Sequence, residues 1–455
     1  HQLDWTRRSR LVLNVQRVTR ETKSRGIAVQ SWHPPMSLSP RPRPRIAAAA
    51  LVLSMACATC VARPSPSSKH KPSETPQQLR SRVGLTEVGT IDGAAYRIDI
   101  PTDWNHNLVV YYHGYAQQSV TFHIAESLTG RQQPLFERHY AVIESAYSQT
   151  GWALPQAYPE TEALRQYFVK RFGPVHETYA VGTSMGGALV MVTLELNPKP
   201  YIGGLDLCGA VGPTFESFDR RFAIRAAFDY YFPGLMPPLD RIPSDFFANR
   251  AERTRIAAAL RENSYAADAM RSLMGLHTDA EVASDIAYFT FVIGDMQRRA
   301  GGNPFDNRNI IYSGTNATNS LSDYELNDKV RRYDAQPAAR AYLLRHYYPT
   351  GRLGRPMLSL HTVYDPVVPV SQLALYSRQV EAAGFSRNLV QQYVHREGHC
   401  TIRQDEVGEA FDELVGWTHG DLRPASGLMK DLHPAPSLRE QQALRPSEVE
   451  NGPKP

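Results

Sequence analysis

The amino-acid sequence predicts an α/β fold, in which a mostly parallel sheet has helices on both faces and a helical insertion interrupts the core. Strand-like apolar runs alternate with segments of helical periodicity in two blocks, residues 84–212 and 356–422. The block between them, residues 213–355, has helical periodicity without buried strands. Residues 182–186 form a glycine-flanked serine motif between a strand and a helix. Such alternation is typical of parallel sheets covered on both sides.

The strands are identified from apolar runs that end at glycine or polar residues. The first two form an antiparallel hairpin in "EVGTIDGAAYRIDI", which turns at Asp92-Gly93. The strands expected after it are "NLVVYYHG", "HYAVIESAY", "ETYAVGTS", "YIGGLDLCGAV", "RPMLSLHTVYD" and "NLVQQYVHREGH". Helical spacing marks "TEALRQYFVKRF" and, directly after the serine motif, "GGALVMVTLEL". These segments predict one α/β core that is built from two parts of the chain.

Residues 213–355 are expected to form a helical cap over the carboxyl edge of the sheet. "FDRRFAIRAAFDYYF" and "DAEVASDIAYFTFVIGDMQRRA" are two of its segments with helical periodicity. The aromatic residues of the cap, Phe228 to Phe232 among them, could line a substrate pocket. The favoured interpretation for most of them is that they form the cap's own core.

The N-terminal region has the pattern of an export signal. From Met36, arginines precede the apolar stretch Ile46–Ala56, and small residues follow, as in a secretory signal peptide at 36–62. The stretch is too short for a membrane span, which needs ~20 apolar residues. Residues 1–35 are expected to be upstream, non-native sequence. The pattern predicts a secreted or periplasmic protein of bacterial type.

Two further segments have compositions that favour irregular structure. Residues 63–83 are rich in Pro, Ser and Lys and predict a flexible linker. Residues 423–455 are polar and interrupted by proline, which predicts a disordered tail. Cys57, inside the signal region, leaves open a lipid anchor at the membrane.

The charge distribution and the spacing of possible metal ligands limit which partners and cofactors the protein is expected to bind. Residues 1–83 hold 15 Lys and Arg against 3 Asp and Glu, out of 50 and 45 in the chain, so the remainder has a net charge of −7. This charge argues against nucleic acid as a partner. The sequence has no spacing typical of metal ligands, such as paired C-x-x-C or H-E-x-x-H. We therefore expect no metal and no cofactor.

Ser184 is the strongest candidate for a reactive residue. It lies in G-x-S-x-G, with an apolar strand before it and a helix after it. Glycines on both sides allow a tight turn that lifts the hydroxyl out of the sheet. The helix N-terminus then directs backbone N–H groups toward any negative charge that develops there.

A serine nucleophile needs a base and an acid, and the chain order predicts both. His399 follows the last strand beside a glycine, whereas the alternatives His395 and His361 lie inside strands. Asp365 ends a buried strand and would hold the imidazole in the correct tautomer. The weaker substitutes for this acid are Glu397 and Asp405.

The oxyanion hole is expected to use two backbone N–H groups. One is that of Met185, directly after the nucleophile. The other is that of Tyr115 in "YYHGYAQQ", where Gly114 allows close approach of the backbone. His113 is expected to support this loop rather than to transfer protons.

The sequence resembles the α/β-hydrolase superfamily over most of residues 86–420, and specifically exported bacterial serine esterases with a large helical cap. The resemblance rests on "PTDWNHNLVVYYHGY", "SAYSQTGW", "GTSMGG", "GNPFDN", "YYPTGRLGRPMLSLHTVYDPVVP" and "GHCTI". It implies that nucleophile, acid, base and oxyanion loop fall on Ser184, Asp365, His399 and Tyr115.

One motif also resembles a different branch of these enzymes. "GHC" is similar to tannase-like and feruloyl-esterase-like enzymes, in which a cysteine beside the histidine pairs with one beside the serine. Here Thr183 precedes the serine instead. Cys208 is the only partner for Cys400 after removal of the signal region, and both a bridge and two free thiols stay open.

These features predict a secreted or periplasmic serine carboxylesterase that forms an acyl-enzyme on Ser184. An amidase or peptidase of the same fold is the alternative, as is a polyester or aryl-ester depolymerising hydrolase. A non-catalytic binding protein would need a damaged triad, and the sequence has an intact one. Haloalkane dehalogenase chemistry would require an aspartate in place of Ser184.

Overall fold

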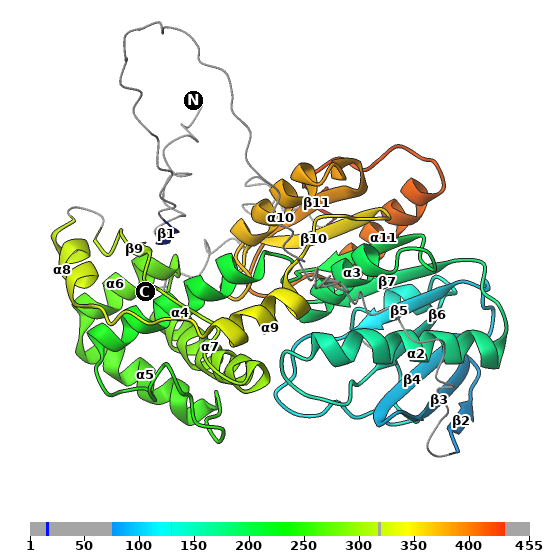
Figure 1. The fold of residues 1–455 in the computed structure, drawn as a ribbon. Helices are drawn as coiled ribbons and strands as arrows, with labels where there is room; N and C mark the ends of the chain where they lie inside the picture. The colour runs from blue at the N-terminus through cyan, green and yellow to red at the C-terminus, as the bar shows by residue number, and fades with distance from the viewer. Residues whose placement is uncertain (1–14, 18–74, 129, 317–319, 433–455) are drawn as a thin grey trace, which may run out of the picture. The chain divides into compact units, whose positions relative to one another are not determined.

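The computed structural model describes residues 15–17, 75–128, 130–316 and 320–432 (Figure 1). The predicted export signal, which includes Cys57, lies outside these ranges. The upstream segment 1–35 also lies outside them, apart from the strand β1 (Val15–Arg17). The described residues contain no helix that is long and apolar enough to cross a membrane.

The core is a ten-stranded mixed sheet in the order β12-β11-β10-β8-β7-β5-β6-β4-β3-β2. The six neighbouring pairs from β12 to β6 are parallel, and β4, β3 and β2 are added antiparallel. The strands are β2 (Gln77–Arg80), β3 (Gly84–Ile91), β4 (Ala94–Pro101), β5 (Leu108–Tyr112), β6 (Ala141–Ser145), β7 (Thr178–Thr183), β8 (Gly203–Leu207), β10 (Met357–Tyr364), β11 (Leu389–Glu397) and β12 (Gly427–Leu428).

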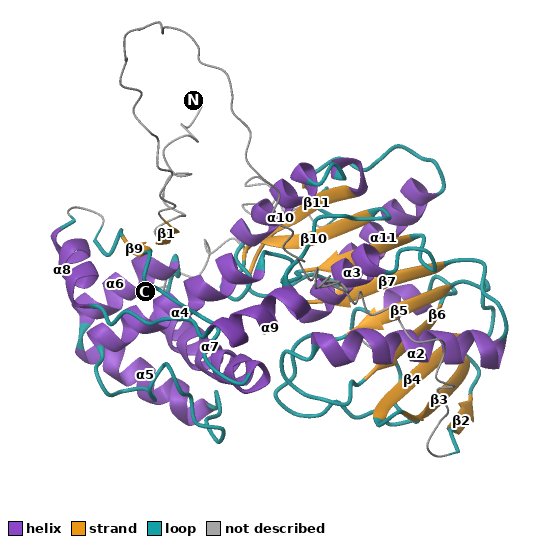
Figure 2. Cartoon of the chain, in the orientation of Figure 1, coloured by secondary structure: helices purple, strands orange, loops and turns teal. Residues whose placement is uncertain are grey.

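Helices cover both faces of this sheet (Figure 2). Alternate residues along β5 show the division, because Val110 packs in the same core as α2 and α3, and Val109 in the core of α11. The helices of this part are α1 (Gln133–Phe136), α2 (Leu154–Phe172), α3 (Met185–Leu196), α10 (Ser371–Ala382), the 3-10 helix η1 (Ser386–Asn388) and α11 (Gln404–Thr418). The predicted fold class, a mostly parallel sheet with helices on both faces, is confirmed.

The segment between β8 and β10 is mainly helical, as its periodicity predicts. Its elements are α4 (Thr214–Tyr231), α5 (Arg250–Glu262), α6 (Ser264–Met274), α7 (Asp279–Ala300), β9 (Ile310–Tyr312), α8 (Leu321–Lys329) and α9 (Pro337–Tyr347). α7 packs against α4, α5, α6 and α9. Phe228 is fully buried and stacks on Phe232, with ring centroids 4.8 Å apart, as expected for a core of its own. We call α4–α9 the cap.

Four short strands, β1, β2, β9 and β12, lie where the sequence predicts none, and each pairs through its backbone with one other strand. β9, inside the cap, pairs antiparallel with β1. β2 lies within the predicted linker 63–83 and pairs with β3. β12 lies within the predicted tail 423–455 and pairs with β11. The four residues of β2 are all exposed at the edge of the sheet, so they have no apolar pattern from which a strand could be predicted.

The parallel strands bring the chemistry to one edge. In parallel strands the carboxyl ends point the same way, and the loops after β5, β7, β10 and β11 contain Tyr115, Ser184, Asp365 and His399. β7, β8, β10 and β11 are consecutive neighbours, so the segments that follow them are close although they are far apart in sequence.

A buried carboxyl group supports this edge from below. Asp206 in β8 is fully buried and accepts a hydrogen bond of 2.7 Å from Ser359 Oγ. Its Oδ1 is so close to Gly187 and Gly209 that a Cβ at either position would be within 2.0 Å of it. Burial raises the pKa of Asp206 to about 7, although the hydrogen bond from Ser359 opposes the shift.

Asp206→Asn should therefore stabilise the protein relative to the wild type in a pH-dependent way. Below pH ~4 the carboxyl is neutral in both the folded and the unfolded state. Between pH ~4 and ~7 only the unfolded state ionises readily, so the free energy of unfolding of the wild type falls by up to about 4 kcal/mol relative to Asp206→Asn. Urea denaturation of both proteins at pH 4, 5.5 and 8 measures this difference. A difference that is the same at all three pH values would contradict the raised pKa.

Candidate active site

Ser184 occupies a strained turn between β7 and α3. Its backbone has φ 59° and ψ −117°, a conformation that side chains rarely adopt. The flanking glycines make the turn fit, since a Cβ on Gly182 would lie 2.2 Å from the carbonyl oxygen of Gly186. A Cβ on Gly186 would lie 2.0 Å from the carbonyl oxygen of Tyr112. The strand–turn–helix context predicted for Ser184 is therefore present.

His399 connects the serine to the acid. Its Nε2 lies 2.9 Å from Ser184 Oγ, and its Nδ1 lies 2.7 Å from Asp365 Oδ2. With the proton on Nδ1, the imidazole donates to the carboxylate and accepts from the serine hydroxyl. The structure thus brings together the three side chains that the chain order predicts.

Asp365 is held rigidly in its turn. Its side chain has no exposed surface, and its Oδ1 accepts hydrogen bonds of 2.8 Å from the backbone N–H groups of Val367 and Val368. Burial acts to raise the pKa of Asp365, but the hydrogen bond and charge of His399 outweigh it and lower the pKa below its ordinary value. The carboxylate is therefore charged and fixed in orientation beside Nδ1.

The rival residues do not reach the serine. His361 is fully buried, with its Nε2 3.8 Å from Asp365 Oδ2 and its Nδ1 hydrogen-bonded to the Thr362 carbonyl. Burial lowers the pKa of His361, against the attraction of Asp365. His395 and Glu397 are exposed on β11. Asp405 is exposed in the first turn of α11.

The loop after β5 lies directly over the serine. A Cβ on Gly114 would meet the Thr183 carbonyl oxygen at 3.2 Å and Ser184 Cβ at 3.3 Å. Within the described part of the chain, the backbone N–H groups of Tyr115 and Met185 have no hydrogen-bond acceptor. Two backbone donors in residues close to Ser184 thus remain available, as an oxyanion hole requires.

His113 supports this loop. Its ring stacks on Tyr147, with centroids 4.0 Å apart, and its Nδ1 is 2.7 Å from the Gly114 carbonyl. Tyr147 in turn donates a hydrogen bond of 3.2 Å to the His113 carbonyl. Burial lowers the pKa of His113. These contacts are those of a neutral imidazole that orders the loop.

Cys208 and Cys400 form a disulfide next to the site. It joins the turn after β8 to the residue that follows His399, with a Cα–Cα distance of 5.3 Å across 192 residues of chain. Both cysteines have positive φ, 50° and 57°. The bridge thus fixes the loop of His399 to the sheet, next to the turn of Ser184, and it does so through backbone conformations that are strained for residues other than glycine.

The sequence pattern did not single out Arg221 of α4. This side chain is buried, pairs with Asp285 of α7, and lies over the Phe289 ring at 4.0 Å. Its Nη2 also donates to the carbonyl oxygens of Pro366 (3.1 Å) and Val367 (2.7 Å), directly after Asp365. The cap therefore holds the acid turn. The sequence did contain a signal for this role. Arg221 lies on the apolar side of a predicted helix, and a buried arginine needs charged or hydrogen-bonding partners.

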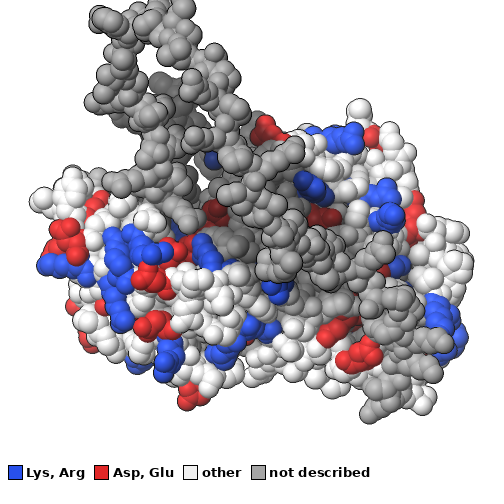
Figure 3. Space-filling view, viewed as in Figure 1, with Lys and Arg blue, Asp and Glu red and all other residues white. Residues whose placement is uncertain are grey.

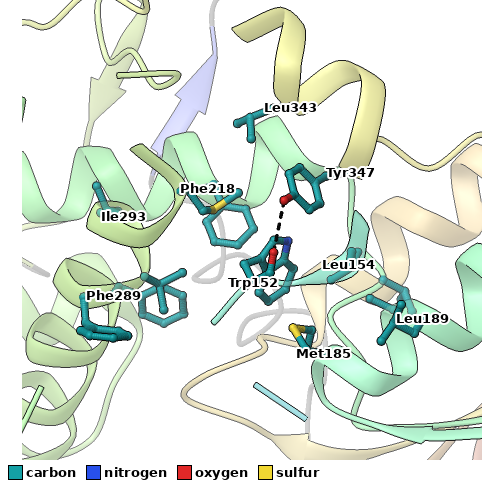
Figure 4. Close-up of a cluster of buried hydrophobic side chains, with 14 of the residues drawn as sticks. Trp152, Leu154, Met185, Leu189, Phe218, Phe289, Ile293, Leu343 and Tyr347 are labelled. Carbon is teal, nitrogen blue, oxygen red and sulfur yellow. Dashed lines mark hydrogen bonds between the residues drawn. The ribbon is translucent and has the colours of Figure 1, made fainter. Parts of the chain in front are cut away.

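Two spaces of different size open onto Ser184. A small cavity of about 40 Å³ extends among buried side chains of the core and the cap, including Trp152, Phe218 and Val292. In Figure 4 Trp152 packs against Phe218, and Tyr347 donates a hydrogen bond to the Trp152 carbonyl. A large cleft of about 460 Å³ also reaches Ser184 and shares Tyr288 and Val367 with the small cavity. Phe228 and Phe232 line neither space.

Comparisons with known proteins give only distant likenesses. No protein-family model matches the chain, and no curated protein matches it by sequence. Among solved structures, Est1E from Butyrivibrio proteoclasticus is 15% identical, covering 76% of this chain and 100% of its own, with a TM-score of 0.35. Acetyl xylan esterase 1 from Thermoanaerobacterium is 11% identical (75% and 89% covered, TM-score 0.35). A Pyrococcus horikoshii acylaminoacyl peptidase is 10% identical (78% and 42% covered, TM-score 0.37).

These likenesses are too weak to indicate an activity, so the fold is assigned from the chain's own topology. In the α/β-hydrolase fold a serine turn follows one of the parallel strands, and an acid and a histidine lie in later loops. Here the turn of Ser184 lies between β7 and α3, and the loops with Asp365 and His399 follow in that order. The described chain has the α/β-hydrolase fold.

Removal of the bridge should weaken the fold. Replacing Cys208 and Cys400 together by alanine should lower the free energy of unfolding by about 2–5 kcal/mol, since the bridge closes a long loop. Guanidinium denaturation of the non-reduced proteins measures the loss. Mass spectrometry of the wild type produced in an oxidising compartment, without reductant, should find neither thiol free, and two free thiols would contradict the bridge.

Proposed function

We propose that this protein is a serine hydrolase that cleaves carboxylic esters through an acyl-enzyme on Ser184. The observation that supports it most is the double hydrogen bond of His399, to Ser184 Oγ at 2.9 Å and to Asp365 Oδ2 at 2.7 Å. A serine hydroxyl becomes a competent nucleophile only when such a base accepts its proton.

The reaction follows from this geometry. Ser184 Oγ attacks the acyl carbon while His399 Nε2 takes the hydroxyl proton. The carbonyl oxygen becomes an oxyanion, which accepts hydrogen bonds from the N–H groups of Met185 and Tyr115. His399 then donates its proton to the leaving oxygen, and the bond between that oxygen and the acyl carbon breaks. Water attacks the acyl-enzyme with His399 as base, which releases the acid and restores Ser184.

Asp365 makes the proton transfers favourable. The charged, buried carboxylate stabilises the imidazolium that forms on His399 and prevents the ring from rotating. The N-terminus of α3 beneath Ser184 adds a favourable dipole for the oxyanion. This mechanism uses only side chains, backbone and water, so it requires no cofactor.

We also propose that the enzyme is exported and acts outside the cytoplasm. The Cys208–Cys400 bridge supports this, because disulfides persist in oxidising compartments. The pattern of residues 36–62 is the sequence argument for the same location. On the face in Figure 3, lysines and arginines are interspersed with aspartates and glutamates among the described residues.

Ser184→Ala should abolish most ester hydrolysis. Removing the nucleophile leaves only binding and the oxyanion donors, so kcat should fall by about 10³- to 10⁶-fold. Hydrolysis of p-nitrophenyl acetate and butyrate by protein starting near residue 63 measures the loss. Ser386→Ala, an exposed serine in η1, is the matched control and should be fully active. Undiminished turnover in Ser184→Ala would remove the proposed nucleophile.

The two histidines near Asp365 should differ sharply. His399→Ala should reduce kcat by about 10³-fold or more because the base is lost. His361→Ala should retain appreciable activity, since His361 hydrogen-bonds its neighbouring carbonyl and does not contact Ser184. The same p-nitrophenyl assay distinguishes them, and the reverse ranking would assign the base to His361.

The assay should also include an amide substrate. The same groups can cleave an amide, so an aminopeptidase substrate and a polyester film belong beside the p-nitrophenyl esters. Faster cleavage of the amide than of the matched ester would replace the esterase assignment by the amidase one.

A further inference from the structure

The scissile bond has to lie at the junction of two very unequal spaces. Ser184 lines both the small cavity, about 40 Å³, and the large cleft, about 460 Å³. An ester bound for attack at Ser184 must therefore place its acyl group in one space and its alcohol in the other. It remains to determine which of the two spaces takes the acyl group and which takes the alcohol.

The position of His399 determines which space takes the alcohol. The imidazole that takes the serine proton later returns it to the leaving alcohol oxygen, so that oxygen must lie on the side of His399. His399 and Cys400 line the large cleft and do not line the small cavity. The alcohol therefore belongs in the cleft, and the acyl group extends into the small cavity.

The volume of the small cavity limits the acyl chain. A cavity of about 150 Å³ binds benzene, and on the same measure about 10–15 Å³ holds one group of the size of a water molecule, which is close to that of a methylene. About 40 Å³ therefore admits about three carbons beyond the carbonyl at most, as in a butyryl group. The walls cannot yield cheaply, because Val292 is 1% exposed and Trp152 packs edge-on against Phe218 with ring centroids 5.2 Å apart.

The cleft can take a much larger group, and polar side chains reach its mainly apolar wall. Its volume is within the range of ordinary small-ligand sites, about 300–1,000 Å³. Gln117 of the core and Arg253 and Ser284 of the cap line it, and each is exposed or half-buried. These side chains can donate hydrogen bonds to several hydroxyl groups of one alcohol.

We propose that the enzyme removes short acyl groups, acetyl to butyryl, from alcohols of sugar size that have several hydroxyl groups. This inference rests on the hydrolase function proposed above. The acyl group lies in the small cavity, against Val292, and the polyol lies in the large cleft, near Arg253.

The acyl part is tested by chain length. For p-nitrophenyl esters of the wild type, kcat/KM should be at least about tenfold higher for acetate and butyrate than for octanoate. Val292→Ala should raise the octanoate-to-butyrate ratio about fivefold or more, and Val292→Phe should lower the butyrate-to-acetate ratio about tenfold. Val282→Ala is the matched control, because Val282 is equally buried on α7 but lines neither space. It should change neither ratio more than about twofold.

The alcohol part is tested with one acyl group. The wild type should hydrolyse methyl 6-O-acetyl-glucoside with a kcat/KM at least about tenfold above that of ethyl acetate. Arg253→Ala should reduce this preference about fivefold through KM, whereas Arg261→Ala, on the same helix and outside the cleft, should not.

The outcomes separate this inference from the function on which it rests. Octanoate hydrolysed as fast as butyrate by the wild type, with Ser184→Ala inactive, overturns the acyl assignment and leaves the esterase intact. Equal rates for the sugar acetate and ethyl acetate overturn the alcohol assignment. Absence of hydrolysis for every ester overturns both the proposed function and this inference. The wild-type ratios need no variant, so a variant that does not fold cannot obscure the result.

Discussion

The position of one imidazole is the constraint on which the rest of the site depends. His399 must face Ser184 with one nitrogen and Asp365 with the other, at 2.9 and 2.7 Å, although 215 residues separate it from the serine. The sheet makes this possible because β7, β8, β10 and β11 are neighbours and parallel. The bridge at Cys400 and the backbone hydrogen bonds of Asp365 then remove the freedom that loops at such an edge would otherwise have.

Much of this arrangement could be predicted from the sequence, for physical reasons. Buried parallel strands have continuous apolar runs, and the turn at Ser184 requires glycines that can be recognised. The carboxyl ends of parallel strands share an edge, so the strand pattern by itself is enough to expect Asp365 and His399 there. The choice of His399 over His361 followed from its position after the strand rather than inside it, and the geometry places only His399 within reach of Ser184.

What could not be predicted depends on contacts between distant residues. β2 and β12 pair through their backbones with β3 and β11, and neither has an apolar pattern from which a strand could be predicted. The partners of Arg221 lie on α7 and on the loop after β10, and no local spacing connects them. The small cavity is the space left unfilled between packed side chains. Its volume therefore follows from how Trp152, Phe218 and Val292 pack together, and their presence in the chain does not reveal it.

The hydrogen bonds of Arg221 have a mechanical consequence. A lid that swings freely can admit large substrates by lifting as a whole. Here, α4 is anchored by a buried guanidinium to the two carbonyl groups that follow Asp365, so displacement of that helix would pull on the carboxylate that orients the base. α4 and the turn of Asp365 are therefore mechanically coupled through this side chain. The cleft lined by Gln117 and Arg253 already reaches the serine without any displacement of α4.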